Sequence, residues 1–149
     1  MNLSRVCIGM RLRDGPWGGG NAAIGALSRH LVSRGITVSH DLDLPKADIV
    51  LLTDPRLSLA SCSFNHRHIT RYLIKNPRSI VVHRINECDE RKGTTDLNKR
   101  IIRSNLCADH TVFVGTWLKD LYRRQGLSSE SYSVILNGSD STLFNRGRY

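Results

Sequence analysis

The sequence lacks long apolar runs and contains few cysteines, and both shortages exclude whole classes of protein. Its longest strongly apolar run, residues 49–52, is far too short to span a bilayer. None of the 4 cysteines forms a CxxC pair, so neither a zinc knuckle nor a redox dithiol is indicated. Free thiols without a disulfide framework suit a reducing compartment. The first residues lead into a short strand with charge close behind, unlike a signal peptide. We therefore expect a soluble, cytoplasmic protein.

The motifs of several well-known enzyme classes are also missing. The sequence contains no GxGxxG, GxxxxGK[ST] or HExxH motif, and no Ser-His-Asp order stands out. The 6 histidines are scattered along the chain. His66 and His68 are two residues apart, which places them on different faces of a helix. We therefore expect no metal site, and catalytic residues stay unknown at this point.

Positive charge is what the sequence has in excess. Lys plus Arg number 22 against 13 Asp plus Glu, a formal net charge of +9 over 149 residues. This excess favours a polyanionic partner, which could be nucleic acid, an anionic membrane surface or a phosphorylated small molecule. Charge alone does not choose among them. Hydrophobic residues make up 40% of the chain, which indicates a globular domain.

Short apolar runs alternate with longer amphipathic stretches, which is typical of a parallel α/β fold. Strands are expected at residues 5–10, 36–39, 48–53, 79–83, 111–114 and 132–136. Helices are expected at residues 21–34, 65–75, 96–107 and 116–125, the first ending at a Gly35 cap. The pattern predicts a doubly wound, mostly parallel six-stranded sheet with helices on both faces, in the strand order 3-2-1-4-5-6. Ligands then bind near the switch point between the first and fourth strands.

A glycine-rich loop, Gly15-Pro16-Trp17-Gly18-Gly19-Gly20, follows the first strand. Glycines let the backbone approach an anion closely, and the start of the helix at Asn21 offers unpaired N–H groups. The simpler interpretation is a flexible connection with a tight turn. Trp17 argues against mere flexibility, because an aromatic side chain in such a loop usually packs on something.

The polar loop over residues 84–95 leaves the fourth strand and is longer than most connections in compact domains. It begins just after His83, and its Asn, Arg and acidic side chains could hydrogen-bond a polyhydroxylated ligand. The alternative is a solvated loop that only prepares the next helix. In either case we expect Thr94 or Thr95 to cap that helix.

One of the expected helices has a basic outer face. In the helix over 65–75, Arg67, Arg71 and Lys75 repeat every four residues and share one face. Such a stripe could rest on anionic lipid or on nucleic-acid phosphates, but a solvated helix face is the simpler interpretation. The apolar residues expected to pack inward are Ile69, Leu73 and Ile74 in this helix and Leu97, Ile101, Ile102 and Leu106 in the helix over 96–107.

Four segments together resemble one enzyme family. They are the glycine loop 15–21, the segment 83–95, the strand and helix start at 108–118, and Val134-Ile135-Leu136-Asn137-Gly138-Ser139-Asp140-Ser141-Thr142-Leu143-Phe144. The last is similar to a V-I-x-N-G-V-D-x-x-x-F stretch, although Ser139 stands in place of the usual valine. Together they resemble the N-terminal domain of retaining glycosyltransferases with the GT-B fold, of the family 4 type.

The resemblance implies a Rossmann-like domain over residues 1–136, with 137–149 starting the interdomain linker. This N-terminal domain receives the acceptor, and a C-terminal domain binds the nucleotide sugar. The donor half would then be missing here or encoded separately, so the chain alone would bind no cofactor. In this family Gly18, Gly19 and Gly20 would approach the donor phosphate. The candidates for the acceptor cleft are Trp17, Asn21, His83, Arg84, Asn86 and Glu87.

The resemblance implies a glycosyltransferase half that is inactive alone, and other functions stay open beside it. The chain could be a non-catalytic module that binds a glycan or a sugar phosphate. A basic nucleic-acid-binding domain ranks last, because aromatic platforms in a basic groove are lacking. We expect a glycan or sugar acceptor as partner, with peripheral contact to anionic membrane as a further option and no specific nucleic acid.

Overall fold

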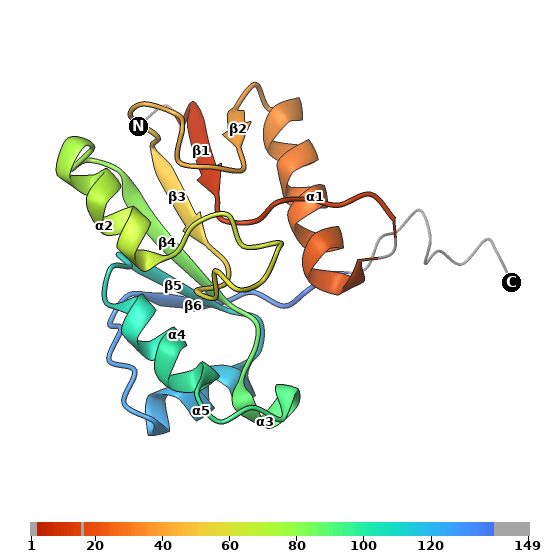
Figure 1. Cartoon of the computed structure of the whole chain (residues 1–149), viewed down its shortest axis with the longest axis vertical. Helices are drawn as coiled ribbons and strands as arrows, with labels where there is room; N and C mark the ends of the chain where they lie inside the picture. The colour runs from red at the N-terminus through yellow and green to blue at the C-terminus, as the bar shows by residue number, and fades with distance from the viewer. Residues whose placement is uncertain (1–2, 16, 139–149) are drawn as a thin grey trace, which may run out of the picture.

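The computed structural model describes residues 3–15 and 17–138, which form one sheet of 6 parallel strands covered by helices (Figure 1). The strands are β1 (Arg5–Ile8), β2 (Thr37–Ser39), β3 (Ile49–Leu52), β4 (Ile80–Ile85), β5 (His110–Phe113) and β6 (Tyr132–Val134). The helices are α1 (Gly18–Ser33), α2 (His66–Lys75), α3 (Asp89–Lys92), α4 (Leu97–Asn105) and α5 (Thr116–Arg124). The expected doubly wound α/β fold is confirmed.

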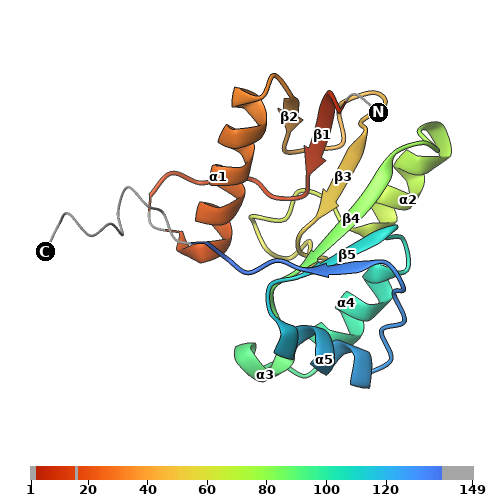
Figure 2. The ribbon, with the colours of Figure 1, turned by 180° about the vertical axis from the view of Figure 1, so that it is seen from behind.

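The helices lie on both faces of the sheet. Helix α1 covers one face, where Ile24 packs against Ile8 of β1. Helices α2, α4 and α5 cover the other face, as the two opposite views show (Figures 1 and 2). There Ile69 of α2 packs against Val50 of β3, and Leu118 of α5 packs in the cluster built around β4 and β5. Burying each such side chain contributes about 1.5–3 kcal/mol, so these contacts hold the layers together.

The strand order is β2-β1-β3-β4-β5-β6, so the expected order 3-2-1-4-5-6 is wrong. Strand β1 pairs with β2 on one side and with β3 on the other. The connection over residues 40–48 contains no helix, and its Leu42 and Leu44 pack in the α2-side cluster, opposite α1. This crossing returns the chain past β1, so the switch point lies between β1 and β3 rather than between the first and fourth strands.

Two segments that the sequence predicts as loops contain regular structure. Residues Gly18–Gly20 form the first turn of α1, which therefore begins before the expected Asn21. The fourth strand continues to Ile85, and the short helix α3 forms within the polar segment 84–95. Glycine is a weak helix former, so local propensity predicts a loop at residues 18–20. Helix α3 has only 4 residues, too few for a helical spacing of apolar side chains to mark it in the sequence.

The expected cap at Gly35 is confirmed. Gly35 has a φ of +77°, the left-handed conformation that glycine adopts without strain. Its N–H donates to the carbonyl of Val32, and the N–H of Ile36 donates to the carbonyl of Leu31. These two bonds are the Schellman pair that ends α1.

Two apolar side chains that the sequence predicts to face the core instead face solvent. Ile74 is 78% exposed and Leu106 is 83% exposed. Each lies five residues after a buried residue of its own helix, Ile69 in α2 and Ile101 in α4. Five residues of helix rotate a side chain by about 140°, which turns it away from the core. The prediction was wrong because both helices are short and bury a narrow stripe.

The chain leaves β6 with exposed apolar residues. Ile135 is 59% exposed and Leu136 is 72% exposed, next to the edge strand β6. These residues directly precede the expected linker over 137–149, of which only residues 137 and 138 are among those described. Apolar side chains grouped at a sheet edge favour association between molecules.

We expect the chain to self-associate as its concentration rises, despite its net charge of +9. Replacing Ile135 and Leu136 together by Ser should shift the mass measured by light scattering towards the monomer. Val32→Ser, which alters an exposed aliphatic residue of α1, is the matched control and should leave the association unchanged. A wild-type chain that stays monomeric at high concentration would contradict this expectation.

Candidate functional site

A pocket of about 280 Å³ lies at the carboxyl ends of the strands, between the start of α1, the segment after β3 and the segment after β4. It lies at the edge of the sheet where ligands of doubly wound folds bind. We call it the carboxyl-edge pocket. Its lining residues are Met10, Trp17, Gly18, Gly19, Gly20, Asn21, Ile24, Thr53, Asp54, Arg56, Leu59, Ser61, Arg84, Asn86, Glu87 and Lys92. Drug-sized ligands occupy about 300–1,000 Å³, so this pocket suits a small ligand or one end of a larger one.

The start of α1 forms one wall of the pocket. Helix α1 has no side-chain cap and no acidic residue in its first turn. Gly18 has a φ of +75°, which a residue with a Cβ rarely adopts, and an added Cβ at Gly18 or Gly19 would meet nothing within 4 Å. The first backbone N–H groups of this long helix have no side-chain acceptor, and they give this end of the helix a positive electrostatic potential.

The loop before α1 is held in place by its own side chains. Asn21 accepts a hydrogen bond from the Arg13 N–H at 2.9 Å and donates to the Arg13 carbonyl at 2.9 Å. Trp17 donates from Nε1 to the Asp14 carbonyl at 2.8 Å, and the Arg13 guanidinium lies 4.6 Å from the centre of its ring. Trp17 nevertheless stays 57% exposed. The indole is thus positioned without being buried, as a platform for stacking would be.

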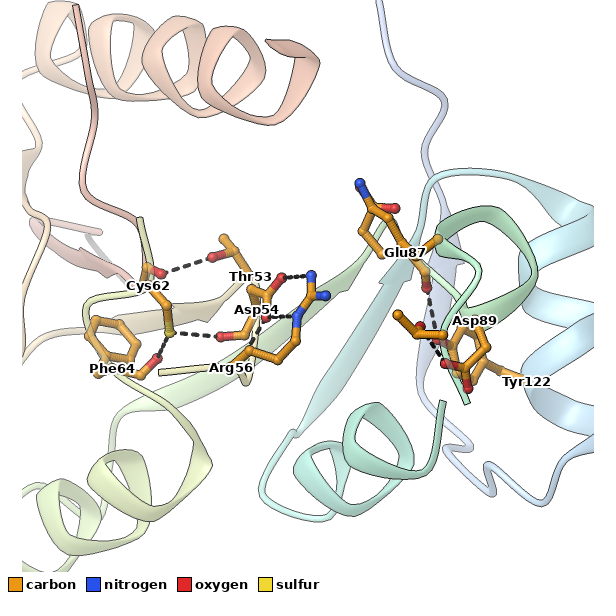
Figure 3. Close-up of polar contacts among 11 residues, drawn as sticks. Thr53, Asp54, Arg56, Cys62, Phe64, Glu87, Asp89 and Tyr122 are labelled. Atoms are coloured by element: carbon orange, nitrogen blue, oxygen red, sulfur yellow. Dashed lines mark hydrogen bonds and ion pairs between the residues drawn. The ribbon is translucent and has the colours of Figure 1, made fainter. Parts of the chain in front are cut away.

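The segment after β3 contributes an ion pair between Asp54 and Arg56. Arg56 donates to both carboxylate oxygens of Asp54, from Nε at 2.9 Å and from Nη2 at 2.6 Å (Figure 3). These hydrogen bonds raise the pKa of Arg56 above its usual value, although burial acts against them. The Cys62 thiol donates to the Asp54 carbonyl at 3.1 Å, and Thr53 donates to the Gly9 carbonyl at 2.9 Å. These two hydrogen bonds hold the backbone of the segment that carries the Asp54–Arg56 pair.

The segment after β4 brings three charged side chains to the opposite wall. Arg84 is half-buried and donates from Nη2 to Asn137 at 2.7 Å; burial lowers its pKa, with Glu87 acting in the opposite direction. Glu87 forms an ion pair with Lys92 through Oε1 at 3.3 Å. Its other oxygen, Oε2, is buried and accepts no hydrogen bond from any described residue. A buried carboxylate oxygen without a donor is costly, so Glu87 is held in the wall at an energetic cost.

The loop that holds Glu87 is fixed from below by the core. Buried Tyr122 of α5 donates its hydroxyl to the Glu87 carbonyl at 2.7 Å and contacts Asn98 at 3.1 Å (Figure 3). Asp89 accepts hydrogen bonds from the backbone N–H groups of Leu97 and Asn98, both at 2.9 Å. Asp89 therefore caps α4, and the expected cap by Thr94 or Thr95 is wrong.

Asp89 caps α4 in place of a threonine because of the path of the chain and the charge of its side chain. The chain between α3 and α4 turns back so that a carboxylate eight residues upstream reaches the first turn of α4. A charged acceptor there interacts with the helix dipole more strongly than a threonine hydroxyl does. Thr94 contacts the capping residue and not the helix itself, because its hydroxyl donates to Asp89 at 2.5 Å.

The candidate residues from the sequence, His83 excepted, all line the carboxyl-edge pocket. His83 is fully buried and does not line it. Its side chain points to the α4 side of the sheet, where Asn105 lies 3.1 Å from its Nδ1. Burial, with a smaller effect of His66, lowers the pKa of His83 to about 3. Side chains alternate along a strand, so Arg84 rather than His83 reaches the pocket.

Sequence reasoning missed Asp54, Arg56 and Lys92. The first two follow directly after β3, whose carboxyl end the corrected strand order places beside that of β1. Polar residues just after a buried strand were the available signal. Lys92 lies in the segment 84–95, but nothing local marks it as the partner of Glu87.

A second pocket, of about 340 Å³, lies at the amino ends of β5 and β6, between the end of α4 and residues 126–131. Ligands of doubly wound folds bind at the carboxyl edge, which favours the smaller pocket as the functional site. Across residues 3–15 and 17–138, no helix is both long and apolar enough to cross a membrane. The same residues contain no cluster of three or more His, Cys, Asp or Glu side chains that could hold a metal ion.

Comparison with known proteins adds no family assignment. A scan against protein-family models finds no match, and a search of curated proteins finds no related sequence. Function is therefore inferred from the fold and from the side chains of the pocket.

Replacing Asp89 by Asn should lower the free energy of unfolding by about 1 kcal/mol at pH 7, because α4 loses a charged cap. Burial alone would raise the pKa of Asp89, but hydrogen bonds from Thr94 and from the Asn98 and Leu97 backbone outweigh it and lower the pKa. The stabilisation is therefore present above the unfolded pKa of about 3.9 and is lost as the pH falls through the folded pKa.

Urea unfolding at several pH values checks this prediction. The difference between wild type and Asp89→Asn should shrink below about pH 4. Glu130→Gln, a change at an exposed acid, is the control and should behave as wild type. A difference that stays constant down to the lowest pH would show that Asp89 does not act through its charge.

Tyr122→Phe should lower the free energy of unfolding by about 1–3 kcal/mol, because the Glu87 carbonyl and Asn98 lose a buried donor. Amide hydrogen exchange should also become faster in residues 86–89. Tyr72→Phe removes a hydroxyl that donates to the Leu44 carbonyl, away from the pocket, and serves as the matched control. Equal amide exchange rates at residues 86–89 in both variants would show that the Tyr122 hydroxyl does not fix this loop.

Proposed function

We propose that this chain is the acceptor-side domain of a nucleotide-sugar-dependent glycosyltransferase, and that it has negligible transfer activity alone. The observation that carries the proposal is the carboxyl-edge pocket. It joins the glycine-rich start of α1 to the segment after β4. These are two of the segments that resemble the family 4 glycosyltransferases with the GT-B fold.

The chemistry of the walls supports a sugar as ligand. Glu87 and Asp54 provide carboxylate acceptors at the walls, Arg56 provides donors, and Asn86 provides both. Sugar hydroxyl groups both donate and accept, so they match such a mixed set of partners. Trp17 adds an exposed apolar face held by its own hydrogen bond. Apolar area combined with a few fixed polar groups is what small-molecule sites share.

The start of α1 supports an anion nearby. Its free N–H groups at Gly18–Gly20 are suited to a phosphate oxygen, and the half-buried Arg84 adds a cation at the opposite wall. In the proposed enzyme this anion is the diphosphate of the nucleotide sugar. The pocket of about 280 Å³ takes only one end of that molecule, so a second domain would supply the remaining contacts.

The proposed partners are a donor-binding domain and an acceptor, because this pocket holds only one end of the nucleotide sugar. Transfer requires donor and acceptor to be held together, which converts a bimolecular step into a unimolecular one. A C-terminal donor domain, in the same polypeptide or on a separate chain, would bring the nucleotide sugar, and a glycan or sugar would be the acceptor. Cys7, Cys62, Cys88 and Cys107 are free thiols, which suits the reducing cytoplasm that we propose as the location.

The same pocket also suits a non-catalytic module that binds a sugar phosphate. Its small volume favours this second candidate, since a hexose phosphate combines the anion with the hydroxyl groups that the walls would satisfy. The two functions differ in one respect. A donor domain added to the chain would restore transfer only if the chain is half of an enzyme.

Thermal unfolding with a panel of ligands tests the proposed site. The panel contains hexoses, hexose phosphates and nucleotide sugars. At least one of these classes should raise the melting temperature, because a ligand bound only to the folded chain stabilises it. Glu87→Gln should weaken that ligand about tenfold or more, since a hydrogen bond to a charged group contributes about 1.5–3 kcal/mol. Glu130→Gln is the matched control and should bind as wild type.

Two outcomes would contradict the proposal. One is a panel in which no sugar or sugar phosphate changes the melting temperature while duplex DNA binds in a salt-dependent way. The other is a sugar whose affinity is unchanged in both Glu87→Gln and Trp17→Ala. The first would favour a nucleic-acid-binding domain, and the second would place the ligand outside the carboxyl-edge pocket.

A further inference from the structure

Helices α2 and α4 repeat one surface pattern. Outward-facing positions of α2 hold Arg67, Arg71 and Ile74, and the corresponding positions along α4 hold Lys99, Arg103 and Leu106. In both sets the spacing is four residues and then three, which keeps the side chains on one side of a helix. Each helix therefore presents two cations followed by one aliphatic side chain.

Both helices lie on one face of the sheet, and α4 ends close to the start of α2 (Figure 1). The Ser104 hydroxyl of α4 lies 2.9 Å from Nδ1 of His66 in α2, which fixes their contact. Both helices connect parallel strands on the same face of the sheet. The two patterns therefore form one surface, which we call the α2–α4 face: Arg67, Arg71, Ile74, Lys99, Arg103 and Leu106.

The cations of this face are not neutralised within the described part of the chain. Arg67, Arg71, Lys99 and Arg103 are exposed, and none of them forms an ion pair with a described acid. Other cations on the same helices add to them: Lys75 is also unpaired, whereas Arg100 is bound to Asp96. The α2–α4 face therefore carries a local positive charge that no described acid balances.

Ile74 and Leu106 give this face its second property. At 78% and 83% they are the most exposed large hydrophobic side chains in the described residues. A single exposed aliphatic residue needs no explanation, but here each one ends a row of cations. Cations beside protruding aliphatic side chains suit an anionic bilayer, where the charges contact headgroups and the aliphatic groups reach the acyl boundary.

We propose that the α2–α4 face binds the surface of an anionic lipid bilayer. Nucleic acid is disfavoured, because phosphates would pair with the cations but would leave Ile74 and Leu106 without a partner. The carboxyl-edge pocket is lined by no residue of this face, so a membrane-bound chain keeps the pocket open. The proposal does not depend on the proposed function of that pocket.

Co-sedimentation with vesicles tests the proposal. The chain should bind vesicles of phosphatidylcholine with one quarter phosphatidylserine at 0.1 M salt, and should bind pure phosphatidylcholine far more weakly. Arg67→Gln with Arg71→Gln should lower the partition coefficient about 25-fold, since each basic residue near such a surface contributes about fivefold. Arg29→Gln with Arg34→Gln removes the same charge from α1, on the opposite face, and should change it much less.

A second pair of variants distinguishes lipid from nucleic acid. Ile74→Ser with Leu106→Ser should weaken vesicle binding about tenfold or more, because burying aliphatic area drives insertion. Binding of duplex DNA, measured by fluorescence anisotropy, should be unaffected by this pair. All positions are exposed, so the melting temperature should stay near that of wild type, which controls for folding.

Three results would overturn the proposal. The first is no sedimentation of wild type with the anionic vesicles. The second is an equal loss in the Arg67/Arg71 and Arg29/Arg34 variants, which would mean that net charge acts without a specific face. The third is unchanged vesicle binding in the Ile74/Leu106 variant together with tight, salt-dependent DNA binding, which would assign the face to nucleic acid.

Discussion

The position of β3 beside β1 is the constraint on which the rest of the structure depends. The connection over residues 40–48 crosses on the face opposite α1 and brings β3 beside β1. The chain therefore leaves the carboxyl end of β1 towards α1 on one face and that of β3 towards α2 on the other. At such a switch point the two connections diverge and leave a space beyond the strand ends. The carboxyl-edge pocket occupies that space. Its walls come from segments far apart in the chain, which meet only because the strands are in this order.

The sequence predicts the elements well and their arrangement poorly. Apolar runs such as 49–52 and helical spacing in 65–75 are local signals, and both produced elements near their expected places. Strand order depends instead on which face a loop crosses, and no local pattern encodes that choice. For the same reason the Asp89 cap could not be predicted, since its acceptor and donors lie eight or more residues apart. Solvent-facing Ile74 and Leu106 show that spacing alone does not define how wide a buried stripe is.

The site was predictable by residue type and less so by geometry. Polar side chains after β1 and β4 do meet in one pocket, because parallel strands bring their carboxyl ends to one edge. His83 lies one residue before Arg84, and the alternation along β4 sends it into the core instead. The Glu87 carbonyl is fixed by the hydroxyl of Tyr122, 35 residues further along the chain, a contact that no sequence pattern reveals. The pocket and the α2–α4 face are separate surfaces, so they are open to separate tests.

The most direct test of the central claim is a two-dimensional ¹⁵N–¹H NMR titration of the chain with a hexose 1-phosphate. The account predicts that the largest shifts fall on the amides of Gly18–Gly20 and on residues 84–87, because the pocket joins these two segments. Saturable shifts confined to them would place a sugar phosphate in the carboxyl-edge pocket. A spectrum that does not change, or shifts limited to α2 and α4, would contradict the account, since the ligand would then avoid the pocket or bind only through surface charge.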